Sequence, residues 1–211
     1  MMTLCGTIRT FGVFKLVGKD KVEKHLISFK VVDGLGNVFD CQMWPDDPQH
    51  AQLLPLVPQV RRRQPVRLEI AGYTVRMRKF KDSTKEEPQL NLIMMNVAFP
   101  DPQKAALPAS IMGFSGKVKS GTSFPIKGGP DRLLSFTVAD EAANTWPCQM
   151  WKDDPQQDQL IATMPAARLQ PVQLEVVSYS LRMREKDGKQ QPQVNFVVSR
   201  VSLPTLNVQA A

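Results

Sequence analysis

The sequence predicts an all-β protein made of two similar five-stranded barrels in tandem, each with one short helix. Three observations lead to this fold class: the chain repeats itself, apolar residues alternate along short segments, and each half has a single helix-like stretch. The 211 residues, of which 42% are hydrophobic, are enough for two domains of about 100 residues each.

The clearest repeat is Cys41-Gln42-Met43-Trp44, which recurs as Cys148-Gln149-Met150-Trp151. Both runs are followed by Asp-Asp-Pro-Gln, and further matches keep the same order on either side. So many ordered matches indicate a duplicated domain. We therefore expect one domain at 1–101, a linker rich in Pro and Ala at 102–109, a second domain at 110–205 and a tail at 206–211.

Three strands open each half. In the first half a strand begins at residues 6–9, and apolar and polar residues alternate along 27–31, which is the period of a half-buried strand. Gly and Asn in the segment 33–37 suit a hairpin turn. The third strand places three apolar residues inward and turns Trp44 outward, and the second half repeats this with Trp151; the inward residues are Phe39, Cys41 and Met43, and in the second half Trp146, Cys148 and Met150.

A short helix and a bent hairpin complete each half. The helix-like segments are Leu53 to Val60 and Leu160 to Leu169, and the last strands are Leu90 to Ala98 and Val194 to Val201. Between them, the apolar parity of the fourth strand changes after Ala71-Gly72, which indicates a β-bulge. Three strands, a helix and a bent hairpin follow the order of the OB-fold, so we expect two tandem OB barrels.

Beyond the bulge, basic residues and an aromatic residue occupy the outward face of the fourth strand. Guanidinium groups suit phosphates, and flat side chains stack on bases, so this pattern favours single-stranded nucleic acid. A net charge of +7 agrees with a polyanionic partner. The candidate binding residues of the first half are Trp44, Arg76, Arg78, Lys79 and Phe80, and those of the second half are Trp151, Arg182, Arg184 and Lys186.

The run from Val66 to Gly72, followed by Val75-Arg76-Met77-Arg78-Lys79-Phe80, resembles the fourth strand of bacterial single-stranded DNA-binding proteins. The pattern Phe29-Lys30-Val31-Val32-Asp33 is similar to that family as well. The resemblance implies a base-stacking role for Phe80 and a DNA path along the basic residues. It also implies coating of exposed strands in replication, repair or recombination, and a homodimer that brings four OB folds together.

The second half departs from this pattern. Glu185-Lys186 stands where the first half has Lys79-Phe80, which removes a ring and adds an acid. Residues 1–104 carry 16 basic and 11 acidic residues, whereas residues 105–211 carry 11 and 9. We therefore expect the first half to bind more strongly. The family's acidic tail has no counterpart in 206–211, so recruitment of partners through such a tail is not expected.

Other classes of function fit the sequence less well. The paired aspartates at 46–47 and 153–154 resemble a metal site, but Asp before Pro is ordinary helix-start chemistry, so no enzyme activity, metal or cofactor is expected. The chain has only three cysteines and no long apolar run, which favours a cytoplasmic protein without membrane contact. The alternatives to DNA are a tandem-barrel scaffold for other proteins, of a primosome or mobile-element type, and RNA, because stacking platforms accept either sugar.

Overall fold

The computed structural model describes residues 2–17, 21–79, 85–100, 112–125, 132–151 and 157–202. The elements of the first half are β1 (Met2–Val17), β2 (Glu23–Val32), β3 (Val38–Met43), α1 (His50–Leu53), η1 (Leu54–Gln59), β4 (Pro65–Lys79) and β5 (Glu86–Ala98). Those of the second half are β6 (Met112–Pro125), β7 (Arg132–Ala139), β8 (Thr145–Met150), α2 (Gln157–Leu169), β9 (Val172–Lys186) and β10 (Lys189–Ser202). The expected linker at 102–109 and the expected tail at 206–211 lie outside the described residues.

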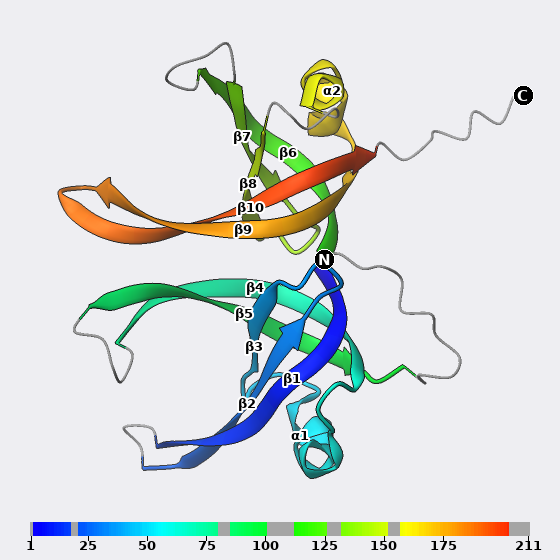
Figure 1. The fold of residues 1–211 in the computed structure, drawn as a ribbon, viewed down its shortest axis with the longest axis vertical. Coiled ribbons are helices and arrows are strands. Elements are labelled where there is room, and N and C mark those ends of the chain that lie inside the picture. The colour runs from blue at the N-terminus through cyan, green and yellow to red at the C-terminus, as the bar shows by residue number, and fades with distance from the viewer. Residues whose placement is uncertain are drawn as a thin grey trace, which may run out of the picture. The chain divides into compact units, whose positions relative to one another are not determined.

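Each half closes into a five-stranded barrel (Figure 1). In the first, β1 pairs antiparallel with β2 and β4, β2 pairs with β3, β3 runs parallel to β5, and β5 pairs with β4. In the second, β7 pairs with β6 and β8, β8 runs parallel to β10, and β9 lies next to β10 and β6. The strand order and the helix between the third and fourth strands are those of the OB-fold, so the predicted fold class is confirmed.

The predicted inward residues form the cores. The side chains of Phe39, Cys41 and Met43, and those of Trp146, Cys148 and Met150, are at most 1% exposed. The Trp146 ring packs against Phe114 and Phe196, and its Nε1 donates a hydrogen bond to Asp140 Oδ2 over 3.1 Å. Loss of hydration on burial raises the pKa of both core thiols, which keeps them protonated and unreactive.

The bulge in β4 lies where the parity of the sequence changes. Ile70 pairs with Met94 and Gly72 pairs with Ile93, so Ala71 is the extra residue. Beyond it, Tyr73 and Val75 pair with Leu92 and Leu90, which are buried in the core. Directly opposed residues share a face of the sheet, and Arg76 and Arg78 therefore lie on the outer face, as predicted.

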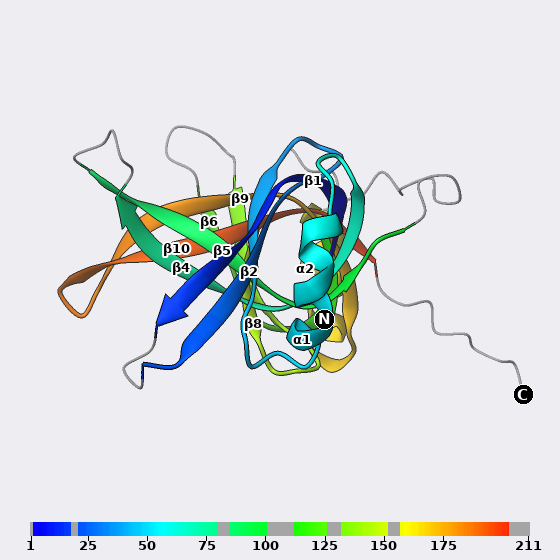
Figure 2. The same cartoon turned by 90° about the horizontal axis from the view of Figure 1, so that it is seen from below.

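Several elements differ from the sequence-based bounds. The last strands and the second helix begin earlier than expected: β5 at Glu86, β10 at Lys189 and α2 at Gln157. The sequence predicts a first strand that begins at residues 6–9, whereas β1 begins at Met2 and continues to Val17. The β1–β2 hairpin and the β4–β5 hairpin both extend beyond the barrel (Figure 2). The first helix is α-helical only over residues 50–53 and continues as a 3₁₀ turn. Pro55 and Pro58 lack the N–H that an α-helix would need there, which accounts for the change.

Candidate nucleic-acid interface

The outer face of the first barrel is defined by cross-strand pairs. Lys30 pairs with Asp40, Ser28 with Gln42, Thr74 with Asn91, and Arg76 with Gln89. Each pair alternates with buried partners, so all of these side chains project away from the core. The outer face thus comprises Ser28 and Lys30 of β2, Asp40 and Gln42 of β3, Gln89 and Asn91 of β5, and Thr74, Arg76 and Arg78 of β4.

Arg76 and Trp44 meet on this face. The guanidinium carbon of Arg76 lies 5.6 Å from the centroid of the Trp44 ring, within the range of a cation–π contact. Trp44 is half-buried, while Arg76 is exposed. Two candidates that lie 32 positions apart in the sequence therefore form one unit, with a positive charge above a flat ring.

A polar relay crosses four strands beside this unit. Lys30 Nζ pairs with Asp40 Oδ1 at 2.5 Å, Gln89 Nε2 donates to Asp40 Oδ2 over 2.6 Å, and Arg78 Nη1 donates to Gln89 Oε1 over 3.1 Å. Asp40 offsets the charge of Lys30, so Arg76 and Arg78 supply the positive charge of the outer face. The relay also orients Arg78.

Sequence reasoning missed the relay residues Lys30, Asp40 and Gln89, although alternation along β2 and β3 places the first two on the outer face. It also missed two acids of β5. Strand pairing sets Glu87 opposite Arg78 and Glu86 opposite Lys79. Opposite charges on paired strands attract, and these carboxylates reduce the positive field toward the end of the hairpin.

Two candidates of the first barrel remain, Lys79 and Phe80. Lys79 is exposed, but it alternates with Arg78 and so lies on the other side of the β4–β5 hairpin. Phe80 lies outside the described residues. The unit that the structure brings together on the outer face therefore consists of Trp44, Arg76 and Arg78.

The second barrel carries the corresponding residues without the same connections. The Trp151 side chain is 37% exposed, and Arg182 and Arg184 are exposed on β9. Gln149, only 3% exposed, donates its Nε2 to Ser180 Oγ over 3.4 Å. Lys186 ends β9, and its side chain lies outside what the structure describes.

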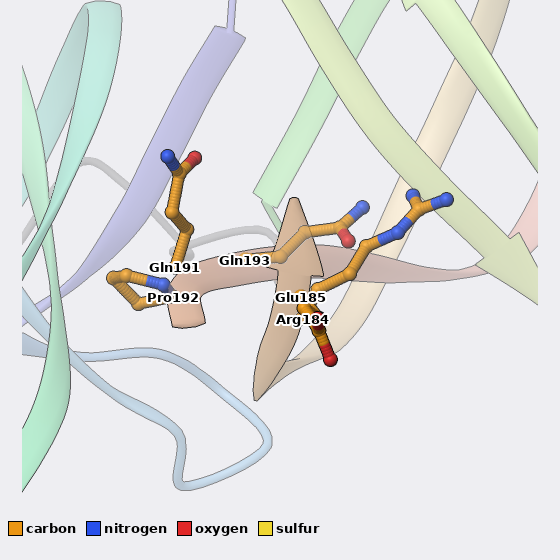
Figure 3. A pocket seen from close by; sticks show the side chains of 5 residues that line it. All are labelled: Arg184, Glu185, Gln191, Pro192 and Gln193. Carbon is orange, nitrogen blue, oxygen red and sulfur yellow. The ribbon is translucent and has the colours of Figure 1, made fainter. Parts of the chain in front are cut away.

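A hollow marks the end of the β9–β10 hairpin. It is lined by Arg184, Glu185, Gln191, Pro192 and Gln193 (Figure 3). The Arg184 and Gln193 side chains extend toward the same side, while the Glu185 side chain points away from them (Figure 3). The acid is therefore adjacent to Arg184 in sequence but faces the other side of the strand.

The acidic turn has a structural role in the first half. Asp47 Oδ2 accepts a hydrogen bond from the Trp44 backbone N–H over 3.0 Å, which fixes the chain where it leaves β3. Asp153 and Asp154 lie outside the described residues. Within the part of the chain that the structure describes, no three His, Cys, Asp or Glu side chains gather as they would around a metal ion. None of the described helices is long and apolar enough to cross a membrane.

Comparison with known proteins finds similarity in solved structures. No protein-family model matches the sequence, and neither does any curated protein. The wild-type single-stranded DNA binding protein from Thermus aquaticus matches with 10% identity and a TM-score of 0.48, covering 97% of this chain and 92% of that one. The small single-stranded DNA-binding protein from Streptomyces coelicolor matches with 11% identity and a TM-score of 0.32, covering 50% of this chain and 97% of that one. A replication protein A heterotrimer bound to single-stranded DNA matches with 10% identity and a TM-score of 0.32, covering 92% and 48% of the two chains.

Proposed function

We propose that this chain binds single-stranded DNA without sequence preference, chiefly through the outer face of its first barrel. The observation that carries the proposal is the contact between Arg76 and Trp44 on the outer face of the sheet. The guanidinium over this indole suits a phosphate, and when a bound strand draws it to that phosphate, the flat ring is left for a base to stack on. Binding of this kind reads no base edges, so it tolerates any sequence.

The polar relay supports the same use of the surface. Arg78 is held by Gln89, and its charge continues the line of Arg76 along β4. Side chains that are already oriented lose less conformational entropy when a strand binds. The bound strand would therefore follow β4, with Phe80 as a further platform beyond the described part of that strand.

The proposed role is stoichiometric coating of exposed strands in replication, repair or recombination, without catalysis. We further propose that two chains form a homodimer that presents four OB folds, and that the protein acts in the cytoplasm. Its three free cysteines, of which two are buried, are consistent with a reducing compartment.

Titration with dT oligomers of increasing length tests the proposal, with tryptophan fluorescence as the signal. Trp146 is buried in its core, so quenching reports Trp44 and Trp151. We expect strong quenching and an affinity that falls steeply with salt, with a log–log slope of about −0.7 for each phosphate contact. Association that is weak and insensitive to salt would refute the function.

Three further measurements test the oligomeric state and the alternatives to DNA. Light scattering of the free chain gives the oligomeric state. Capture of partners from a lysate, with and without nuclease, separates DNA binding from a protein scaffold, because protein partners that survive digestion favour the scaffold. Competition between dT and rU oligomers decides between DNA and RNA.

A further inference from the structure

A phenylalanine on β1, which the function above does not use, is exposed on the first barrel. The Phe14 side chain is 56% exposed. Its ring lies along its own strand over Gly12, since a Cβ on Gly12 would be 3.6 Å from Phe14 Cε2. The ring therefore lies over a position where the strand has no side chain of its own.

Register places Phe14 in line with Trp44. Phe14 pairs with Leu26 of β2, and Ile27 pairs with Met43 of β3, so the next step of the register brings Leu26 beside Trp44. An ion pair of 3.5 Å between Lys24 and Asp46 continues this alignment past the end of β3. Phe14, Leu26 and Trp44 form a row across three adjacent chain segments, which we call the aromatic row.

The aromatic row belongs to the outer face. Leu26 shares the parity of Ser28 and Lys30 and alternates with the buried Ile27. Leu26 is 8% exposed although it points away from the core, as expected of an apolar side chain that lies between the Phe14 and Trp44 rings. Neighbouring strands lie about 4.8 Å apart, so the two rings stand roughly two such spacings from each other. The row ends at Trp44, beneath the Arg76 guanidinium.

The second barrel has the same three residue types in the same strand register. Phe124 pairs with Leu133 of β7, and Leu134 pairs with Met150, the residue before Trp151. Both copies of the duplicated domain thus have Phe, Leu and Trp at the same three register positions. Core packing does not account for the phenylalanine of the first copy, because most of that side chain is in contact with solvent.

We propose that Phe14 is a second base-stacking platform, and that a bound single strand crosses from Trp44 over Leu26 to Phe14. This inference rests on the proposed function and names a further contact for the same ligand, an unpaired nucleobase. A nucleobase fits better than a protein side chain because the row leads directly to a positively charged arginine, which suits a phosphate. The exposed Val13 and Val17 alternate with Phe14 and lie on the other side of the hairpin.

The test compares Phe14→Ala with Val17→Ala, an exposed apolar residue of the same hairpin on the opposite face. We expect Phe14→Ala to weaken binding to dT oligomers by about tenfold and Val17→Ala to leave it unchanged. Phe14→Leu keeps an apolar side chain without a flat ring and should also weaken binding, so that the result does not depend on the alanine variant folding. Photocrosslinking of the wild type to oligomers that contain 5-iododeoxyuridine should label the peptide with Phe14.

A tryptophan reporter makes the test direct. Phe14→Trp in a background of Trp44→Phe and Trp151→Phe should bind DNA with quenching, since the other tryptophan, Trp146, is buried. If the wild type binds dT but Phe14→Ala binds equally well and the reporter is not quenched, the inference is wrong and the function stands. If the wild type does not bind dT, the proposed function itself fails. A change of mass in light scattering with unchanged affinity would assign Phe14 to a protein contact and also overturn the inference.

Discussion

The two barrels have the same features that shape their backbones. In each, an aspartate caps the turn between the second and third strands: Asp33 Oδ1 accepts the Asn37 N–H over 2.8 Å, and Asp140 Oδ1 accepts the Asn144 N–H over 2.9 Å. In each, one residue is skipped in the pairing of the first two strands, after Ile8 and after Val118. The scaffold has therefore been retained through the duplication.

The outer faces of the barrels differ. Strand pairing joins Lys30 to Asp40 in the first barrel, and the same register position joins Thr137 to Pro147 in the second. The charged pair that anchors the polar relay thus has no counterpart. A duplicated β-barrel keeps the residues that shape its backbone, whereas its outward positions can change charge without loss of the fold, because they contribute little to the core.

The largest expected effect concerns the shared scaffold. A Cβ on Gly6 would lie 2.3 Å from the Val32 carbonyl oxygen, and one on Gly116 would lie 2.5 Å from that of Ala139. Gly6→Ala and Gly116→Ala should each lower the free energy of unfolding by about 3 kcal/mol or more, since backbone must move. Urea denaturation measures this, and Gly72→Ala, whose nearest neighbour is 3.9 Å away, is the control. If one barrel kept its stability after its Gly→Ala substitution while the other lost it, the two scaffolds would differ at this close backbone contact.

Binding to DNA should separate the barrels. Arg76→Ala with Arg78→Ala should weaken affinity for dT oligomers by about tenfold to a hundredfold and flatten the salt dependence. Arg182→Ala with Arg184→Ala should cost only a few-fold. Fluorescence titration at several salt concentrations measures both. Equal losses would remove the asymmetry, and tighter binding after Arg76→Ala alone would show that this arginine merely covers Trp44.

Quenching of tryptophan fluorescence by DNA should also come mainly from the first barrel. Trp44→Phe should remove most of the quenching by dT, because Trp44 lies beneath Arg76 on the proposed binding face. Trp151→Phe should leave most of the quenching. Saturating titrations of the two variants give the amplitudes. Loss of the signal in Trp151→Phe alone would assign the DNA contact to the second barrel.

A charge change should strengthen the weaker barrel. In a chain that already carries Arg76→Ala and Arg78→Ala, Glu185→Lys with Lys186→Phe should raise affinity for dT a few-fold. The double change gives the second half the Lys-Phe order of the first half and adds a ring. Glu141→Gln, which makes the same net change of charge (+1) at an exposed turn, is the control. Equal gains in both variants would show that net charge alone determines affinity.

The weakest predicted effect is a pH dependence that Asp140 gives to the second barrel. Burial raises the pKa of Asp140, but hydrogen bonds from Asn144 and Trp146 outweigh it, so this pKa lies below its usual value. Such a group stabilises the fold above its unfolded pKa of about 3.9 and ceases to do so as pH falls through the lower folded value. Asp140→Asn should flatten the loss of stability in this acid range, and Trp146→Phe, which removes one donor, should cost about 1 kcal/mol at pH 7. Urea denaturation at pH 7 and at pH 3 measures both, and an unchanged acid slope in Asp140→Asn would contradict the assignment.

Local patterns in the sequence are enough to predict the duplicated all-β fold, the inward residues and the bulge at Ala71. Each of these follows from local alternation of apolar residues or from comparison of the two halves, and strand geometry turns that alternation directly into faces. The sequence also singled out Trp44 and Arg76 as separate candidates.

Which of the candidate residues come into contact depends on how the strands pair in the folded barrel. The Arg76–Trp44 contact, the relay from Lys30 to Arg78 and the aromatic row all depend on pairing between strands that are distant in the chain. The register of such pairs is set by the closed barrel and its bulges, and the period of one strand carries no information about its neighbour. For that reason Phe14 was missed: on its own strand it is one apolar residue among several, and it gains a role only from the segments beside it.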